Sequence, residues 1–226
     1  MRCSWVLVLG TWLLLHLPAN AAAKPHVISF GKTTTVKWLV GLDEEKAVDL
    51  KVRPLFVDTR VKEYTTGPAR DITDRLFVVR RVFRLNDALP EDPATPARWQ
   101  WQRGGWLLVD RMTGRVTPVN LPEFDALYSA ASWYRDYVAY CGISDDGRKA
   151  FAIVAQVGRR KPLLKKQLGS IELNGMPDFA CRAPQWQRQP ARVTFPGQGG
   201  ERTTFSIRGH VIDLVNDQEE EAEATE

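Results

Sequence analysis

The chain has 226 residues, with 31 Lys and Arg against 27 Asp and Glu, so its formal net charge at neutral pH is only +4. A charge so close to balance gives no overall field that would attract a polyanion, and we expect no nucleic-acid partner. The length suits one domain of ordinary size.

The first 23 residues have the pattern of a secretory signal peptide. Arg2 gives a positive start, residues 5–17 form an almost unbroken apolar run, Pro18 ends it, and the small residues at 19–23 offer cleavage sites. This apolar run is shorter than the about 20 residues that a membrane-spanning helix needs. We therefore predict an exported protein, periplasmic or secreted, with no transmembrane segment in the mature chain.

Residues 24–216 are predicted to form a single all-β domain. Helical periodicity is nearly absent, while short runs rich in β-branched and aromatic residues alternate with Gly, Asp and Pro. The acidic residues 217–226 cannot bury apolar surface and are expected to form a disordered tail. The clearest expected strands are 48–57, 76–85, 106–110, 137–143, 150–157, 191–195, 203–207 and 210–215.

Turn signals and weak repetition indicate how these strands are grouped. Asp146-Gly147 and the segment 110–114 are typical of hairpin turns. A Trp-x-Arg segment begins at Trp101, at Trp133 and at Trp186. The runs fall into about four antiparallel β units, at about 26–66, 75–120, 133–169 and 185–215. This grouping favours a small propeller-like array, with a β-sandwich or an irregular barrel as the alternative.

Two of these turns carry a family resemblance. Residues 143–152, Ile-Ser-Asp-Asp-Gly-Arg-Lys-Ala-Phe-Ala, resemble the Ser-Pro-Asp-Gly-Lys turn and following strand of TolB-type β-propeller repeats. Residues 108–116 are similar to the Asp-x-x-Thr-Gly-Lys hairpin of the same repeats. The resemblance covers about residues 106–157, has Asp145 where the family has proline, and shows each motif clearly once. It implies a binding scaffold and no particular activity.

Cys141 and Cys181 are the two cysteines that follow the signal peptide. Export into an oxidising compartment predicts a disulfide between them. Two buried free thiols are the alternative, because two cysteines give no spacing pattern to test.

The candidate ligand-binding residues are Trp99, Trp101, Arg103 and Trp106. Trp99 and Trp101 lie two residues apart, so on a strand they share one face. Exposed tryptophan beside Gln and Arg suits a carbohydrate, because the ring stacks on the sugar while amides and guanidinium groups bind its hydroxyls. The alternative, which the recurrence of Trp-x-Arg favours, is structural: the rings pack and the arginines lie over them.

A basic patch is formed by Arg159, Arg160, Lys161, Lys165 and Lys166. On an exported protein such a patch could bind anionic glycan, acidic lipid or an acidic protein. The alternative is an edge strand on which Lys and Pro prevent edge-to-edge aggregation.

The sequence predicts no catalytic residue, no metal site and no cofactor. His26 and His210 have no second His, Cys or carboxylate at ligand spacing, and no serine lies in a nucleophile motif. We expect a non-catalytic binding or structural protein of the cell envelope, whose partner is an envelope glycan or another envelope protein. The alternative is a carbohydrate-active enzyme that uses a carboxylate pair, either Glu123 with Asp125 or Asp145 with Asp146.

Overall fold

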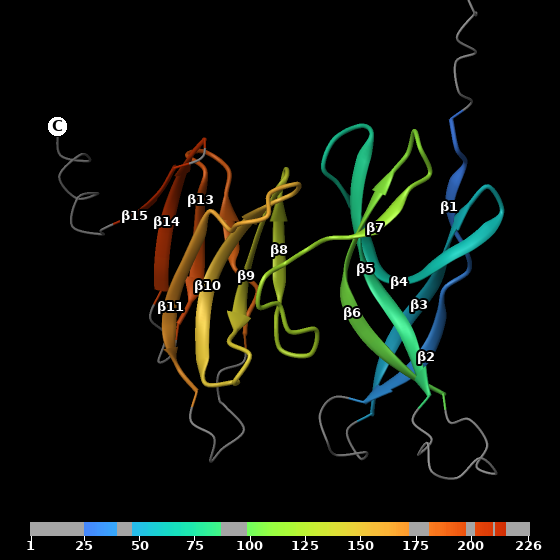
Figure 1. The fold of residues 1–226 in the computed structure, drawn as a ribbon, viewed down its shortest axis with the longest axis horizontal. Helices are drawn as coiled ribbons and strands as arrows, with labels where there is room; N and C mark the ends of the chain where they lie inside the picture. The colour runs from blue at the N-terminus through green and yellow to red at the C-terminus, as the bar shows by residue number, and fades with distance from the viewer. Residues whose placement is uncertain are drawn as a thin grey trace, which may run out of the picture.

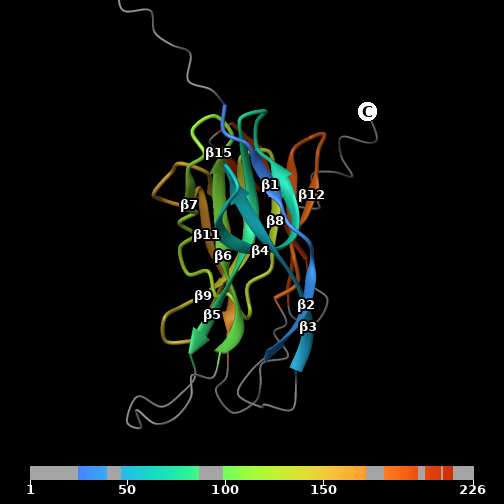
Figure 2. The same cartoon turned by 90° about the vertical axis from the view of Figure 1, so that its right-hand side faces the viewer.

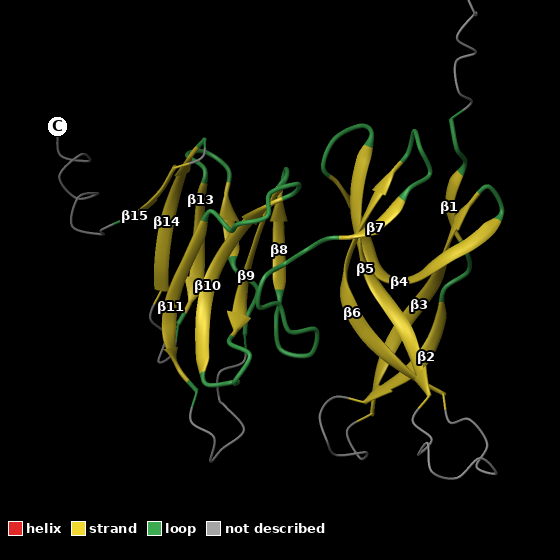
Figure 3. Cartoon of the chain, viewed as in Figure 1, coloured by secondary structure: helices red, strands yellow, loops and turns green. Residues whose placement is uncertain are grey.

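The computed structural model describes residues 25–39, 47–86, 99–171, 181–197, 202–209 and 211–215, and every regular element within them is a β-strand (Figure 3). The all-β prediction is therefore confirmed. The predicted signal peptide, the predicted acidic tail and His210 lie outside the described residues. Within the described ranges, no helix is long and apolar enough to cross a membrane.

The strands are β1 (Ile28–Phe30), β2 (Thr34–Leu39), β3 (Ala47–Val57), β4 (Arg60–Asp71), β5 (Leu76–Asn86), β6 (Trp99–Asp110), β7 (Val116–Pro118), β8 (Ala131–Tyr134), β9 (Tyr137–Ile143), β10 (Lys149–Gln156), β11 (Leu164–Ser170), β12 (Gln185–Gln187), β13 (Arg192–Pro196), β14 (Arg202–Arg208) and β15 (Val211–Leu214). They form three sheets, which we call sheet A (β1–β7), sheet B (β8–β11) and sheet C (β12–β15). Figure 1 shows sheet A on the right and sheets B and C on the left.

The three sheets differ from the expected four units because β4 pairs with β5. This antiparallel pairing joins the first two expected units, 26–66 and 75–120, into the seven-stranded sheet A. Sheets B and C are each a four-stranded antiparallel meander, in the orders β11-β10-β9-β8 and β12-β13-β14-β15. This arrangement of several packed sheets fits the sandwich alternative.

Sheet A is curled into a partly closed ring, which faces the viewer in Figure 2. β3 pairs with both β2 and β4, and β2 meets β6 through a single parallel pair, Trp38 with Trp101. Two apolar clusters fill the inside of the ring, one around Leu55 and Phe77 and the other around Trp38 and Val82. The interior is thus packed with side chains.

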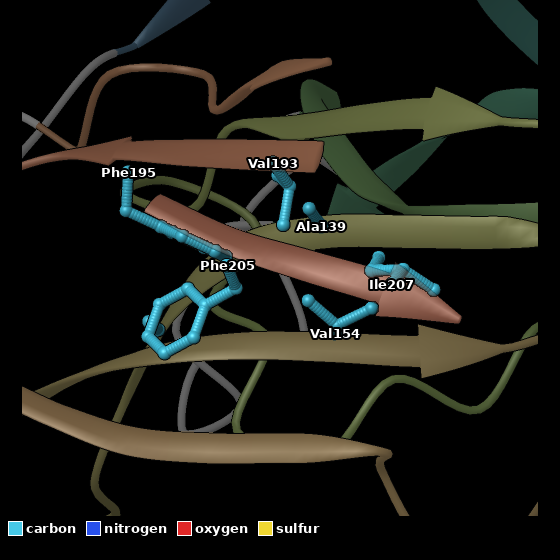
Figure 4. Packing of buried hydrophobic residues seen from close by; sticks show 7 residues of the cluster. Ala139, Val154, Val193, Phe195, Phe205 and Ile207 are labelled. Atoms are coloured by element: carbon cyan, nitrogen blue, oxygen red, sulfur yellow. The ribbon is translucent and has the colours of Figure 1, made fainter. Parts of the chain in front are cut away.

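Sheet B lies between the other two sheets. This position explains why the sequences of β9 and β10 are continuous apolar runs. Val138 and Ile153 face sheet A, where they pack with Val78 of β5. Ala139 and Val154 point the other way and pack against sheet C in the cluster drawn in Figure 4. Both faces of the sheet are covered, so alternate residues are buried on opposite sides.

The two predicted hairpin turns are confirmed. Gly147 has a φ of 71° in the turn that joins β9 to β10. Gly114 has a φ of 62° in the hairpin of β6 and β7, and an added Cβ there would lie 2.8 Å from atoms of both His26 and Val57. Only glycine fits this position without strain.

The predicted disulfide between Cys141 and Cys181 is also confirmed. The two Cα atoms lie 6.0 Å apart, and the sulfur atoms are bonded. Cys141 is buried in β9, and Cys181 lies just before β12. The bridge therefore fixes the start of sheet C to the centre of sheet B.

Candidate functional site

The two tryptophans of the predicted pair differ in exposure. Trp99 is 58% exposed, whereas Trp101 packs inside the ring of sheet A, with its ring centroid 5.3 Å from that of Tyr64. The guanidinium carbon of Arg84 lies 5.8 Å from the Trp99 ring centroid and 5.4 Å from that of Trp101. Trp101 is thus partly buried against the core, and of the two rings only Trp99 is exposed, although both lie beside the Arg84 guanidinium group.

Arg103 and Trp106 lie together at a different place, a cavity of about 270 Å³ between sheets A and B. We call it the arginine cavity, because Arg80 of β5 lines it beside Arg103. Arg80 is only 5% exposed. The sequence analysis missed it, since Arg80-Arg81 in an apolar strand is also the pattern of two surface charges.

Irregular strand pairing on both sides of β5 positions Arg80. Thr66 pairs with Arg80 and Arg70 with Val78, so β4 carries two extra residues beside Arg80. On the other side Arg80 pairs with Trp106 and Val82 with Arg103, which leaves one extra residue in β6. Such bulges redirect side chains and disturb the ladder locally, and they are over-represented at sheet edges and next to active sites.

Burial and mutual repulsion govern the charges in the arginine cavity. Burial and, to a lesser extent, the nearby Arg103 charge lower the pKa of Arg80 to about 9, and Asp125 partly opposes both effects. Burial also lowers the pKa of Arg103. The two guanidinium groups are therefore poorly solvated cations that face the same space.

A second, larger cavity of about 920 Å³ lies where strands of all three sheets meet. We call it the junction groove. It is lined by residues 69–72 at the end of β4, by 133–135 of β8 and its turn, and by 188, 189 and 191 of the turn between β12 and β13. It shares no lining residue with the arginine cavity.

Three arginines, Arg70, Arg135 and Arg188, surround the junction groove. Its carboxylate, Asp71, is paired with Arg111, whose Nη2 lies 2.6 Å from Oδ1. No carboxylate oxygen of the described residues lies within ion-pair distance of the three arginines. The groove therefore presents an excess of positive charge.

Backbone strain and an aromatic pair accompany Arg135. Its φ is 52°, a conformation that glycine adopts more easily. Its guanidinium carbon lies 5.4 Å from the ring centroid of Tyr134, and the Tyr134 ring lies 5.4 Å from that of Trp186. The turn thus holds a cation above an aromatic surface at the groove.

Two of the three Trp-x-Arg segments occupy equivalent positions. Trp133 lies on β8 and Trp186 on β12, the first strands of sheets B and C, and each ring packs toward the preceding sheet. Arg135 and Arg188 then follow, and both line the junction groove. Trp101 differs, because it lies within β6 and packs inside the ring of sheet A.

The basic patch is divided among several structural roles. Lys165 and Lys166 lie on β11, an edge strand of sheet B. Lys165 Nζ lies 2.5 Å from Glu123 Oε1, so its charge is balanced. Arg159 and Arg160 border a third cavity of about 250 Å³, and Lys161 is exposed in the same loop. These contacts favour the edge-strand interpretation for β11.

The carboxylates considered for an enzyme have local contacts. Asp125 Oδ1 accepts hydrogen bonds from the backbone N–H groups of Leu127 and Tyr128. The Ser144 hydroxyl donates to Asp146 and, with a backbone N–H group, lowers the Asp146 pKa. Asp145 is exposed in the same turn.

No cluster of three or more His, Cys, Asp or Glu side chains that could hold a metal ion occurs in the part of the chain that the structure describes. His26 instead pairs with Asp58, with Nδ1 2.5 Å from Oδ2.

No protein-family model matches the chain, and neither the curated proteins nor the solved structures give a match. Its function is therefore inferred from the geometry and charge of the cavities described above.

Proposed function

We propose that this protein is an exported, non-catalytic binding protein of the cell envelope that holds an anionic glycan chain in the junction groove. The observation that carries the proposal is the convergence of Arg135 and Arg188, which come from separate Trp-x-Arg segments in different sheets, on the same groove. The pattern of residues 1–23 and the Cys141–Cys181 disulfide support export.

The chemistry of the groove suits a charged sugar polymer. At about 920 Å³ it is larger than the arginine cavity and the third cavity, and it has polar groups converging from three sheets. Arginine side chains can bind uronate or sulfate groups, and the amide of Gln189 can bind hydroxyls. The Tyr134 ring contacts both Arg135 and Trp186 and so helps to hold Arg135 at the groove.

We also propose that sheets B and C are two copies of one propeller-like unit. Both are four-stranded meanders, and both begin with a strand whose tryptophan packs on the preceding sheet. The Ser144-to-Lys149 turn that resembles TolB-type repeats lies in sheet B. In this proposal the groove forms at the equivalent ends of successive units.

The test is equilibrium binding to alginate oligosaccharide, a polyuronate, with neutral dextran as the comparison. We expect saturable binding to alginate that weakens as salt is raised, because exposed charges are screened beyond about 8 Å at physiological ionic strength. The double variant Arg135→Ala/Arg188→Ala should raise the Kd by about tenfold, since each exposed charge pair contributes up to about 1 kcal/mol.

Arg148→Ala provides the matched control. Arg148 is exposed in the turn between β9 and β10, at the opposite end of β9 from the groove. This control should leave the Kd unchanged. Equal binding to dextran, equal binding to polyglutamate, or a double variant that binds alginate normally would each contradict an anionic-glycan site in the groove.

A further inference from the structure

The arginine cavity contains a buried cation without a matching anion. Arg80 Nη2 donates a 2.9 Å hydrogen bond to the carbonyl oxygen of Ala126, but the buried Nε has no hydrogen-bond partner within the described ranges. The guanidinium carbon lies 4.7 Å from the Phe124 ring centroid and 5.7 Å from that of Trp106. A carbonyl group and ring faces stabilise the charge only in part.

No carboxylate of the described residues lies within ion-pair distance of Arg80 or Arg103. Asp125 raises the pKa of Arg80 by electrostatic attraction, without an ion-pair contact. Its Oδ1 instead accepts hydrogen bonds from the backbone N–H groups of Leu127 and Tyr128. Arg103 adds a second positive charge, and its guanidinium carbon lies 4.9 Å from the Trp38 ring centroid. Buried charges in proteins are normally paired with an opposite charge.

Apart from Thr66, the rest of the lining is apolar or glycine. Leu50, Pro68, Ala130 and the Trp106 ring surround the two guanidinium groups. The indole Nε1 of Trp106 is a further buried donor with no partner in the described part of the chain. An engineered apolar cavity of about 150 Å³ in another protein holds benzene, so about 270 Å³ here has room for a ring-sized body.

We propose that the arginine cavity binds a small organic carboxylate with a compact apolar body. The carboxylate would lie between Arg80 and Arg103, where charge-assisted hydrogen bonds to guanidinium groups are shorter and stronger than neutral ones. The apolar body would contact Leu50, Pro68 and the Trp106 ring. This site is independent of the glycan proposal, because no lining residue is shared with the junction groove.

The competing explanation is that Arg80 is a purely structural residue, held by Ala126 and by two aromatic rings. The two explanations predict different effects on ligand binding and on thermal stability when the Arg80 charge is removed. Arg80→Met retains much of the aliphatic stem but removes a cation that is unpaired in the cavity. If Arg80 serves a ligand, this variant should lose ligand binding while its unliganded thermal midpoint stays level or rises. A purely structural arginine would give a clear loss of stability and no ligand effect.

The experiment titrates the full chain with sodium acetate, butyrate and benzoate, and with inorganic phosphate, at a constant ionic strength of about 0.15 M. Tryptophan fluorescence reports on the cavity through Trp106, and the thermal midpoint gives a second readout. We expect saturable changes that strengthen from acetate to benzoate, with phosphate weaker than benzoate. Arg80→Met should raise the benzoate Kd by about tenfold to a hundredfold, because hydrogen bonds to charged groups contribute about 1.5–3 kcal/mol.

Arg81→Met is the matched control, because it removes the same charge from the next residue of β5. Arg81 pairs with Glu63 and does not line the cavity, so the benzoate Kd should change by less than about twofold. Arg103→Met is a second test variant, which should also weaken benzoate binding and does not depend on the folding of Arg80→Met.

Four results would overturn the proposal: no saturable response to any carboxylate, phosphate binding as tight as benzoate, an unchanged benzoate Kd in Arg80→Met, or an unchanged Kd in Arg103→Met. The alginate assay tests residues of another cavity. A negative result for carboxylate binding therefore does not bear on the glycan proposal, and a negative result for alginate binding does not bear on the carboxylate proposal.

Discussion

The indole Nε1 of Trp186 donates a 3.0 Å hydrogen bond to the carbonyl oxygen of Ser132. This bond joins the first strand of sheet C to the first strand of sheet B, two edge strands that are not hydrogen-bonded neighbours in any sheet. It therefore fixes the two sheets relative to each other beside the junction groove, where Arg135 and Arg188 converge.

Trp186→Phe should weaken the contact between sheets B and C. Phenylalanine keeps an aromatic ring in the cluster but cannot donate the hydrogen bond, so a partly buried carbonyl group loses its partner. We expect the free energy of unfolding to fall by about 1–3 kcal/mol in urea denaturation. Trp99→Phe, at a site that is 58% exposed, is the control and should change it by less than about 0.5 kcal/mol. Equal effects of the two substitutions would contradict the role of the bond.

Removal of the disulfide should destabilise the protein. The bond closes a loop with a sequence separation of 40 residues. Loop-closure entropy in the unfolded chain then predicts that Cys141→Ala/Cys181→Ala lowers the free energy of unfolding by about 2–4 kcal/mol. Chemical denaturation with and without reductant measures this, and reductant should have no effect on the double variant. A double variant as stable as the oxidised protein would show that the bridge contributes nothing.

Stability should fall in acid partly through Asp110. Arg75 binds its carboxylate through two hydrogen bonds and is the main cause of its lowered pKa. Because the folded-state pKa lies below that of the unfolded chain, the contribution is present above the ordinary carboxylate pKa of about 3.9 and is lost as the pH falls below it. Asp110→Asn should therefore reduce the slope of the thermal midpoint against pH between about pH 5 and 2. An unchanged slope would contradict the assignment.

Lysines on the edge strand β11 should limit aggregation. Lys165→Val/Lys166→Val removes two charges from a strand that pairs on one side only, with β10. We expect faster growth of light scattering at high protein concentration, because an uncharged edge can pair with another chain. Lys149→Val is the control, since Lys149 is exposed on β10, which pairs with both β9 and β11. Similar scattering from both variants would show that hydrophobicity alone, and not the open edge, causes the aggregation.

The strand positions could be predicted from local sequence because apolar runs and turn residues determine them. Residues 137–143 were expected to be a strand and form β9 with the same bounds, and 150–157 differs from β10 by one residue at each end. The edge strand β11 was absent from the clearest expected strands, since its Lys-Lys-Gln sequence lacks an apolar pattern, and was anticipated only as the edge-strand interpretation of the basic patch. Its assignment depends on pairing with β10, which local sequence does not encode.

Only some of the residues that line the cavities could be predicted from the sequence. Arg103 and Trp106 were recognised as candidates, but Arg80 was not, because its burial depends on extra residues in β4 and β6 on either side of it. Bulges of this kind leave a weak signal, here Gly67-Pro68 and Gly104-Gly105. The junction groove combines segments more than 50 residues apart, and its assembly follows from how whole sheets stack.

The middle position of sheet B has a consequence for the growing chain. Sheet C follows sheet B in the chain, so the face of sheet B formed by Ala139, Ala152 and Val154 has no cover until Phe205 and Ile207 have been synthesised. A nascent or truncated chain that ends near residue 171 would display this apolar face to other molecules. Such a chain should be held unfolded or bound by a chaperone until its C-terminal meander is complete.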